Sequence, residues 1–593
     1  MATVPVPVPA PAPAPWQLDV STPTLGVRVW LEDGKVCLHI GNDGARGAPC
    51  SMLVLPVTSA DPLTLEPAID LRRRYGSERN RNNFDRRYRR TPSTTLPSPY
   101  TQRYSRCGWC KLGPRNPVRL VVLMFHQGPL TREIAFPPTR AAVTVAATED
   151  EELMLLESLF APATRNPQWL QRGLVFLDPA DLPGARQSKG PPPAFDATTF
   201  VVASCQYPAG LLDGTPPSAP RQRCGPADAA MLRLAARLRT PGADRPSLLV
   251  LAGDQVYVDA TAGLFDPRAR VAPAEPVARA SREIENWLRI PYENWLGSAG
   301  ALAVLGSVPT LMMFDDHEIS DNWEPLPPPA DPQAEADNEA RKRAGVAAYV
   351  RYQRNDVGGN GLPTLWHTHE HRGLRFFMGD TRTERTPRRA ALDPLAARIM
   401  SPRQTMALTE WLRSGRDRPS FVVTPAMLLP RLRSSARSPH GALHSDAWDG
   451  YPGSLNAMLA LLCREQIENV VFLSGDAHLS FIARATVCDS TGNRVVIHSV
   501  HSSALYAPYP FANAVAADFE VPDAWSFEDP CDASLSYRVE VEVDANAWAP
   551  GDGFACLQVR PGAVSGWQVE VQFDRDLQRH PEHAARMPVV ITL

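Results

Sequence analysis

The sequence lacks long apolar runs. No stretch approaches the roughly 18 to 20 consecutive apolar residues that a membrane-spanning helix requires. A secretory signal is also lacking, because the N-terminus alternates proline with small residues and has neither a basic start nor an apolar core. We therefore expect a cytoplasmic protein with no membrane partner, in which residues 1–15 form a disordered, extended, Pro-rich tail.

Cysteine is scarce, with 10 residues unevenly spaced along a chain of 593. This scarcity excludes a small secreted scaffold held by disulfides and suits a reducing compartment. Cys107 and Cys110 form the one CxxC pair in the sequence, and no second pair completes a four-thiolate zinc site. The pair could be half of a zinc site or a redox pair, and we favour two ordinary cysteines with neither role.

A large charge of either sign is lacking as well, since the formal net charge is -3. This excludes a global attraction to nucleic acid or to anionic lipid. One segment stands out, from Leu71 to Arg90, where arginines alternate with Tyr75, Phe84 and Tyr88. Such a pattern can hold phosphates and stack bases. Because no basic neighbourhood extends it, we favour a solvated loop or a lid near a charged substrate.

The length and composition predict at least two globular domains. A chain of 593 residues exceeds the usual size of one hydrophobic core, and 44% hydrophobic with 21% charged residues is typical of folded proteins. Short alternating runs from about Trp16 to Val145 predict a β-rich N-terminal domain, which with its linker spans 16–193. From 194 to 593, buried strands alternate with amphipathic helices, which predicts an α/β layered domain.

One helix can be placed in detail. Ser401 and Gln404 form a capping box and Pro402 occupies the first turn, so a helix is expected to begin here and to end before Gly415. Its apolar side chains are predicted to lie in the core, and they are Met406, Leu408, Trp411 and Leu412.

Candidate metal ligands follow four apolar runs, FVVAS, SLLVLAG, PTLMMF and NVVFLSG, which are predicted to be buried strands. If these strands are parallel, their carboxyl ends meet at one edge of a sheet and the side chains converge. Packed carboxylates repel one another unless cations lie between them. Each residue alone could cap a helix or a turn, but together they predict a metal cluster. The candidates are Cys205, Asp254, Tyr257, Asp315, Asp316, His317, Asp476 and His478.

The types of ligand narrow the choice of metal. Phenolate and thiolate donors, from Tyr257 and Cys205, favour a highly charged transition metal such as ferric iron. Carboxylates also suit Ca²⁺, Mn²⁺ or Mg²⁺.

The motifs GDQVY, FDDHE and SGDAH, preceded by ASCQ, resemble the motif series of the alkaline phosphatase D (PhoD-like) family of calcineurin-type metallophosphoesterases. AYVRYQ, FFMGDTRTER and HSDAWDGYPG are similar to further segments of that family, in the same order. The resemblance runs from about Phe200 to His501. It implies a layered sandwich of two mixed β-sheets flanked by helices, preceded by a β-rich domain.

The resemblance also implies roles for individual residues. The ligands of an Fe³⁺ ion would be Cys205, Asp254, Tyr257 and His478. Asp254 would bridge to a second metal held with Asp316 and Asp476. The family implies Ca²⁺ as this second metal, with Mn²⁺, Mg²⁺ and Zn²⁺ as alternatives, and His317 as the catalytic histidine.

These assignments predict a mechanism for phosphoester hydrolysis. A hydroxide bridging the two metals would attack phosphorus in line, with no covalent enzyme intermediate. His317 would donate a proton to the leaving oxygen, or would only support the site. Arg382 would clamp a phosphate oxygen, and an ion pair with Asp380 or another nearby carboxylate is the alternative.

Other histidines match no ligand pattern of this kind. His367, His369 and His371 alternate in WHTHEHR, so in a strand they would share one face and could bind a transition metal. We favour an ordinary surface or edge strand instead. His498 lies within the run RVVIHSV and His501 follows it, and both are interpreted as ordinary polar residues near the cleft.

The sequence thus predicts a metal-dependent phosphoesterase that acts as a monomer on small-molecule phosphate esters, monoesters or diesters. One alternative is a nuclease or nucleotide phosphodiesterase that uses residues 72–90 to bind its substrate. The other is a phosphate-binding protein without turnover, against which the intact His317 argues.

Overall fold

The computed structural model describes the chain from residue 197 onward, with gaps, and before that point only the course of eight strands. The tail 1–15, the CxxC pair and the Arg-rich segment 71–90 lie outside the described residues. The gaps after residue 197 are 208–225, 240–243, 260–287, 289–290, 293–294, 296–297, 306–307, 309, 354–363, 389–393, 509–513, 530–531, 545–546, 563–565 and 576–586.

The eight N-terminal strands pair in antiparallel fashion. They form a two-stranded sheet, β1-β5, and two three-stranded sheets, β2-β3-β6 and β4-β7-β8. The alternating runs in the sequence coincide with four of these strands. The strands are β1 (Trp16–Gln17), β2 (Val27–Glu32), β3 (Lys35–Ile40), β4 (Cys50–Val57), β5 (Thr64–Leu65), β6 (Tyr100–Tyr104), β7 (Val118–His126) and β8 (Leu170–Leu177).

Downstream, the first of two large sheets has the order β11-β10-β9-β22-β23-β24, with β18 beside β9. Strands β9, β10 and β11 are parallel, and Leu251 of β10 lies level with Ala203 of β9 and Met312 of β11. Their carboxyl ends therefore meet at one edge. The strands are β9 (Thr198–Gln206), β10 (Leu248–Leu251), β11 (Thr310–Met312), β18 (Ala504–Tyr506), β22 (Ala555–Pro561), β23 (Trp567–Phe573) and β24 (Val589–Thr592).

The second sheet has the order β12-β13-β14-β15-β17-β16-β20-β19, with β21 beside β16. Strands β13, β14, β15 and β17 are parallel, and the others are antiparallel to their neighbours. The strands are β12 (His367–His371), β13 (Leu374–Met378), β14 (Ser420–Val423), β15 (Val470–Ser474), β16 (Leu479–Asp489), β17 (Arg494–His501), β19 (Asp523–Glu528), β20 (Ser536–Val543) and β21 (Ala549–Pro550).

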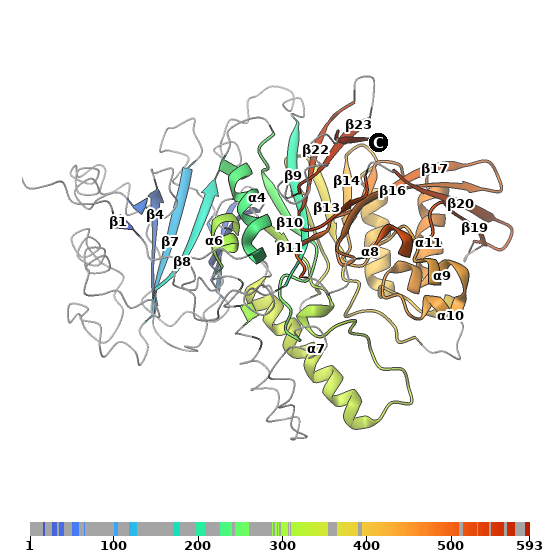
Figure 1. The fold of residues 1–593 in the computed structure, drawn as a ribbon, viewed down its shortest axis with the longest axis horizontal. Coiled ribbons are helices and arrows are strands. Elements are labelled where there is room, and N and C mark those ends of the chain that lie inside the picture. The colour runs from blue at the N-terminus through green and yellow to red at the C-terminus, as the bar shows by residue number, and fades with distance from the viewer. Residues whose placement is uncertain are drawn as a thin grey trace, which may run out of the picture.

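The two sheets face each other across one apolar core (Figure 1). Phe200 of the first sheet contacts Phe376 and Phe421 of the second edge to face, with ring centroids 5.3 and 4.9 Å apart. Such pairs prefer edge-to-face geometry because the ring edge is positive and the face negative. Both faces of the central strands are covered, which is why FVVAS and NVVFLS are apolar throughout instead of alternating.

Helices cover the outer face of each sheet (Figure 1). Helices α4 (Ala229–Arg239), α6 (Ala299–Leu305) and part of α7 (Pro332–Tyr352) lie on the first sheet. Helices α8 (Pro402–Arg413) and α11 (Pro452–Arg464) lie on the second. The predicted fold class, two mixed sheets flanked by helices, is confirmed. No described helix is both long enough and apolar enough to cross a lipid bilayer.

Helix α8 begins as its sequence predicts but differs from the prediction in two respects. Ser401 caps it by accepting a hydrogen bond from the Gln404 backbone N–H at 3.2 Å. The Gln404 side chain does not close the capping box, because it bonds to the backbone of Asp380 instead. Met406 is 72% exposed, so its prediction as a core residue is wrong: the helix presents that position to solvent.

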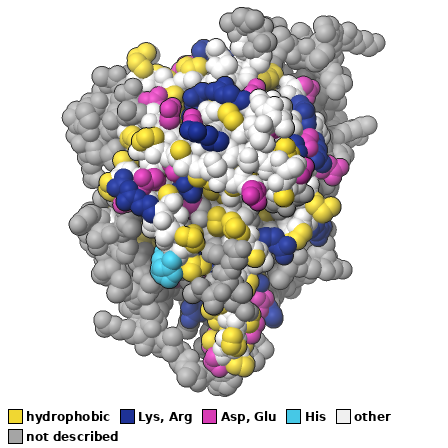
Figure 2. All heavy atoms as spheres, turned by 90° about the vertical axis from the view of Figure 1, so that its right-hand side faces the viewer, with side chains coloured by type: hydrophobic (Ala, Val, Ile, Leu, Met, Phe, Trp, Pro, Cys, Tyr) yellow, Lys and Arg dark blue, Asp and Glu magenta, His cyan; other side chains and the backbone are white. Residues whose placement is uncertain are grey.

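The face seen in Figure 2 carries basic and acidic side chains interspersed with one another. Among the described residues, surface arginines are paired with glutamates: Arg413 and Arg416 with Glu465, and Arg437 with Glu520. These exposed pairs each contribute little to stability.

Candidate active site

Four loops converge beyond the ends of β9, β10, β11 and β15. Three of these strands are parallel neighbours in the first sheet, but β15 belongs to the facing sheet, so the expectation of a single sheet edge is wrong. The loops nevertheless touch, because the backbone N–H of Asp476, after β15, donates to Cys205 Sγ, at the end of β9, at 3.3 Å. The site therefore lies across the seam between the two sheets.

Four carboxylates meet at this seam. Each of Asp254, Asp315, Asp316 and Asp476 offers one oxygen that lies within 4.8 Å of the others. The first three are buried, and Asp476 is partly exposed. We call these four residues the acidic group. Asp315 belongs to this group, although the family resemblance assigns it to neither metal.

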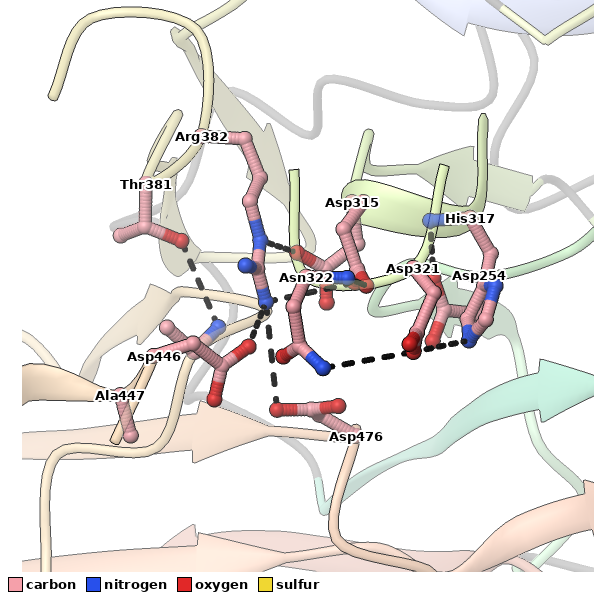
Figure 3. Close-up of polar contacts among 12 residues, drawn as sticks. Asp254, Asp315, His317, Asp321, Asn322, Thr381, Arg382, Asp446, Ala447 and Asp476 are labelled. Carbon is pink, nitrogen blue, oxygen red and sulfur yellow. Dashed lines mark hydrogen bonds and ion pairs between the residues drawn. The ribbon is translucent and has the colours of Figure 1, made fainter. Parts of the chain in front are cut away.

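Arg382, which follows β13, lies inside the acidic group and is fully buried. Its Nε donates to Asp315 Oδ1 at 2.5 Å and its Nη2 to Asp446 Oδ2 at 2.5 Å. Nη2 also lies 3.3 Å from Asp316 Oδ1 and 4.0 Å from Asp476 Oδ2 (Figure 3). Nη1 donates to no described residue. The guanidinium is thus held by carboxylates on both sheets with one donor still unused.

The single positive charge of Arg382 does not balance the negative charges that the four carboxylates of the acidic group would carry if ionised. Burial raises the pKa of Asp315 to about 7, against the opposing effect of Arg382. Burial and the neighbouring carboxylates also raise the pKa of Asp254 and of Asp476 well above their usual range. Asp315 Oδ2 and Asp316 Oδ1 accept no hydrogen bond from any described residue. These buried oxygens fit metal cations, which would balance the charge and occupy the unused acceptors.

The remaining predicted ligands lie beside this group in two pairs. The Cys205 thiol donates to Asp254 Oδ2 at 3.5 Å, and Tyr257 Oη lies 3.2 Å from His478 Nε2. Burial raises the pKa of Cys205 and of Tyr257, so both would ionise only beside a cation. His478 Nδ1 is buried and has no described hydrogen-bond partner. Neither Cys205 nor His478 belongs to a group of three or more potential ligand atoms that lie within 4.8 Å of one another among the described residues.

His317 is held by a carboxylate that sequence reasoning missed. Its Nδ1 lies 2.9 Å from Asp259 Oδ1, its ring stacks on Tyr257 at 4.0 Å, and its Nε2 is 3.8 Å from Asp321 Oδ1. Burial lowers the pKa of His317, but the carboxylates of Asp259, Asp316 and Asp254 outweigh burial and raise it well above the usual range. The sequence offered one signal for this role, namely that Asp259 lies only two residues after the predicted ligand Tyr257.

The backbone at the site adopts a conformation that L-residues rarely take. Of the seven non-glycine residues with positive φ among those described, five lie here. Their φ angles, between 51° and 79°, place them in or near the left-handed region, which costs free energy and is concentrated at functional sites. They are Cys205, Asp254, Asn322, Asp476 and His478.

Glu318 fixes two of these loops through its carboxylate. Oε2 accepts from the backbone N–H groups of Asp254 at 3.2 Å and Asp315 at 2.9 Å, and Oε1 accepts from that of Gln255 at 3.0 Å. The Gln353 side chain, from the AYVRYQ motif, donates to Oε1 at 2.9 Å. Burial raises the pKa of Glu318 to about 7, and these hydrogen bonds oppose the rise.

His501 fixes the loop of the SGDAH motif, so it has a definite structural role. Its Nε2 accepts a hydrogen bond from the Ala477 backbone N–H at 3.4 Å, and its Nδ1 lies 2.8 Å from the Leu479 carbonyl oxygen. This pattern requires the neutral ring, protonated on Nδ1, and burial lowers the pKa of His501 to about 4.

The three alternating histidines lie in the edge strand β12, as favoured from the sequence. Their side chains share one half-buried face. His371 Nε2 lies 2.9 Å from Ser247 Oγ. None of the three belongs to a group of close metal-binding side chains among the described residues.

A sandwich of two mixed sheets flanked by helices, with a buried acidic group at the seam, is the architecture of a calcineurin-type metallophosphoesterase. The chain belongs to the PhoD-like phosphatase family, whose model matches residues 228–537, just over half of the 593 residues. Of the predicted ligands, only Cys205 lies before the matched segment. Family membership makes the chain a phosphoric ester hydrolase.

One solved structure supports this fold. A structure titled "Structure of PhoD" aligns with a TM-score of 0.52 and 13% identity, over 98% of this chain and 90% of its own. A purple acid phosphatase, PPD1, from yellow lupin (Lupinus luteus) seeds aligns with a TM-score of 0.42 and 10% identity, over 95% of this chain and 74% of its own. No curated protein matches the sequence.

Proposed function

We propose that the protein hydrolyses phosphomonoesters, phosphodiesters or both, with metal ions bound at the seam between the sheets. The observation that carries this proposal is the acidic group, four carboxylates around one buried arginine. The proposed ligands of ferric iron are Cys205, Asp254, Tyr257 and His478. Asp254, Asp316 and Asp476 would hold a divalent metal, with Ca²⁺ favoured over Mn²⁺, Mg²⁺ or Zn²⁺.

When bound, the metals would supply the positive charge that lets a water nucleophile approach an anionic phosphoryl group. The protein's own residues bind and orient the ester. Arg382 is proposed to stabilise the phosphoryl group by its positive charge, from a buried position in which Asp315 and Asp446 hold its Nε and Nη2. Its remaining donor, Nη1, is buried as well, so a direct hydrogen bond to a phosphoryl oxygen requires the neighbouring loops to move.

His317 is placed to protonate the leaving oxygen. Asp259 accepts the Nδ1 proton, which leaves Nε2 facing Asp321, in a group of close side chains that also includes Asp316. Stacking on Tyr257 limits rotation of the ring. Asp259 is therefore proposed as a positioning residue for the proton donor.

Substitution of Asp259 by Asn is expected to change rates according to the leaving group. Hydrolysis of β-glycerol phosphate, whose alkoxide must be protonated, should slow by about 10² in kcat/KM. Hydrolysis of p-nitrophenyl phosphate, whose phenolate leaves unprotonated, should slow by no more than about threefold. Equal losses for both esters would show that Asp259 only supports the fold.

The proposed function is tested by metal analysis of the purified protein together with hydrolysis of p-nitrophenyl phosphate and bis-p-nitrophenyl phosphate. Iron and a second metal are expected in the protein. Chelation should abolish turnover, and adding iron and calcium should restore it. The ratio of the two rates distinguishes a monoesterase from a diesterase. If no metal is bound and neither ester is cleaved, the protein is a phosphate-binding protein instead.

A further inference from the structure

A cavity of about 250 Å³ adjoins the acidic group. Its walls are largely apolar and are contributed by Met427, Leu432, Ala447, Ala477, Ala514 and Phe519. Asp446 and Asp476 also line it, and Asp518 lies at its exposed rim. Of these residues, only Asp476, as a proposed metal ligand, and Asp446, which holds Arg382, have a role in the proposed chemistry. We call this cavity the side pocket.

The side pocket opens next to the proposed phosphate position. Asp446 and Asp476 line the pocket and both face the Arg382 guanidinium, at 2.5 and 4.0 Å from Nη2. Figure 3 shows Asp446 on one side of the Arg382 guanidinium and Asp476 below it. Because Asp476 is also a proposed metal ligand, a phosphoryl group bound beside it would have the pocket within reach of its ester oxygen.

The walls of the side pocket are preformed. Leu432 and Phe519 pair through an isolated antiparallel bridge, and the Leu432 backbone N–H donates to Asp449 Oδ2 at 2.7 Å. Phe519 is 1% exposed and its ring packs against Phe481 and Trp548, with centroids 5.4 and 5.9 Å away. Because these contacts fix the walls before any ligand arrives, binding there requires little ordering of the protein.

The volume and charge of the side pocket limit its occupant. A cavity of about 150 Å³ is sufficient to hold benzene, so a pocket of 250 Å³ accommodates one aromatic ring with substituents. Three carboxylates and no described basic side chain line it. An anionic group would be repelled there, whereas an uncharged apolar group would bury surface against Phe519, Met427 and Leu432.

We propose that the side pocket binds the organic group of the substrate and makes the enzyme select phosphoesters of uncharged, apolar groups about the size of one aromatic ring. This inference rests on the proposed function, since it assigns a substrate class to the same site. It predicts discrimination against esters whose organic part carries further anionic groups.

Alkyl- and arylphosphonates test the side pocket without leaving-group chemistry, because their C–P bond is not hydrolysed. Inhibition constants are measured against p-nitrophenyl phosphate for methyl-, phenyl- and 4-carboxyphenylphosphonate. Phenylphosphonate should bind the wild type at least about tenfold more tightly than methylphosphonate. The 4-carboxy group should remove most of this advantage. Equal inhibition by the methyl and phenyl compounds would overturn the proposal.

Two variants of one segment complete the test. Ala514→Phe fills the side pocket and should reduce the affinity for phenylphosphonate to that for methylphosphonate, whose own inhibition constant stays unchanged. Ala517→Phe adds the same side chain at an exposed position that does not line the pocket, and it should behave as the wild type. An unchanged phenyl preference in Ala514→Phe contradicts the proposal. If the wild type neither cleaves esters nor responds to phosphonates, the result contradicts the proposed function itself.

Discussion

Substitution of Asp254 by Asn is expected to lower kcat/KM for p-nitrophenyl phosphate by about 10³-fold, equivalent to about 4 kcal/mol. Asp254 is central to the site: Oδ1 accepts from the His317 backbone N–H at 3.3 Å and Oδ2 faces the Cys205 thiol at 3.5 Å. Asn keeps the shape and one acceptor but loses the negative charge, so metal content should fall with activity. Steady-state kinetics and elemental analysis of the same sample measure both effects.

The matched control is Asp529→Asn. Asp529 is also a buried, paired carboxylate, since it accepts from Arg464 at 2.9 Å and from the Tyr537 hydroxyl at 2.8 Å, but it lies outside the acidic group. This variant should lose stability while its kcat/KM and metal content remain within about twofold of the wild type. Full metal content and activity in Asp254→Asn would show that the acidic group does not hold the metals.

Substitution of Gly475 by Ala is expected to destabilise the protein by about 3 kcal/mol and to lower activity by about 10²-fold. A Cβ at this position would lie 2.3 Å from Ser204 Cβ and 2.4 Å from Ser204 Oγ, distances that no real contact shows. The loops after β9 and β15 would have to separate, which displaces Cys205 and Asp476. Denaturant unfolding and steady-state kinetics measure the two effects.

The Gly475→Ala effect should be reversed by a second substitution. Ser204→Gly removes both atoms that the new Cβ would meet, and the next nearest atom, the Ala252 carbonyl oxygen, is 3.4 Å away. The double variant should recover most of the stability and activity, with a coupling free energy of about 2 kcal/mol. If the double variant is no better than Gly475→Ala alone, close approach of the two sheets is not the reason for the glycine.

The positions of the predicted ligands could be read from the sequence because each follows a run of buried strand residues. Strand ends are fixed by local pattern, and Asp254, Asp316 and Asp476 lie where that pattern stops. The sheet to which each strand belongs was not predictable in this way. A run such as NVVFLSG has the same appearance in either sheet, since both are covered on two faces.

Contacts between residues far apart in the sequence were not predictable from the local pattern, although Arg382 itself was a predicted site residue. Arg382 and Asp446 are separated by 64 residues, and no periodicity connects them. Asp259 contacts His317 across 58 residues. Met406 has the spacing of a core residue, yet the packing of α8 leaves it exposed. The Arg-rich segment 71–90 and the division at 193 remain predictions.

The position of the site across the seam has a consequence for the molecule as a whole. Asp254 and Asp316 are carried by the first sheet and Asp476 by the second, so a cation bound by all three would tie the two halves of the sandwich together. Ligand binding then becomes folding free energy: above the dissociation constant, each tenfold rise in free metal adds about 1.4 kcal/mol to the free energy of unfolding. On this view the metal supply of the cell would govern how long the protein survives as well as how fast it works.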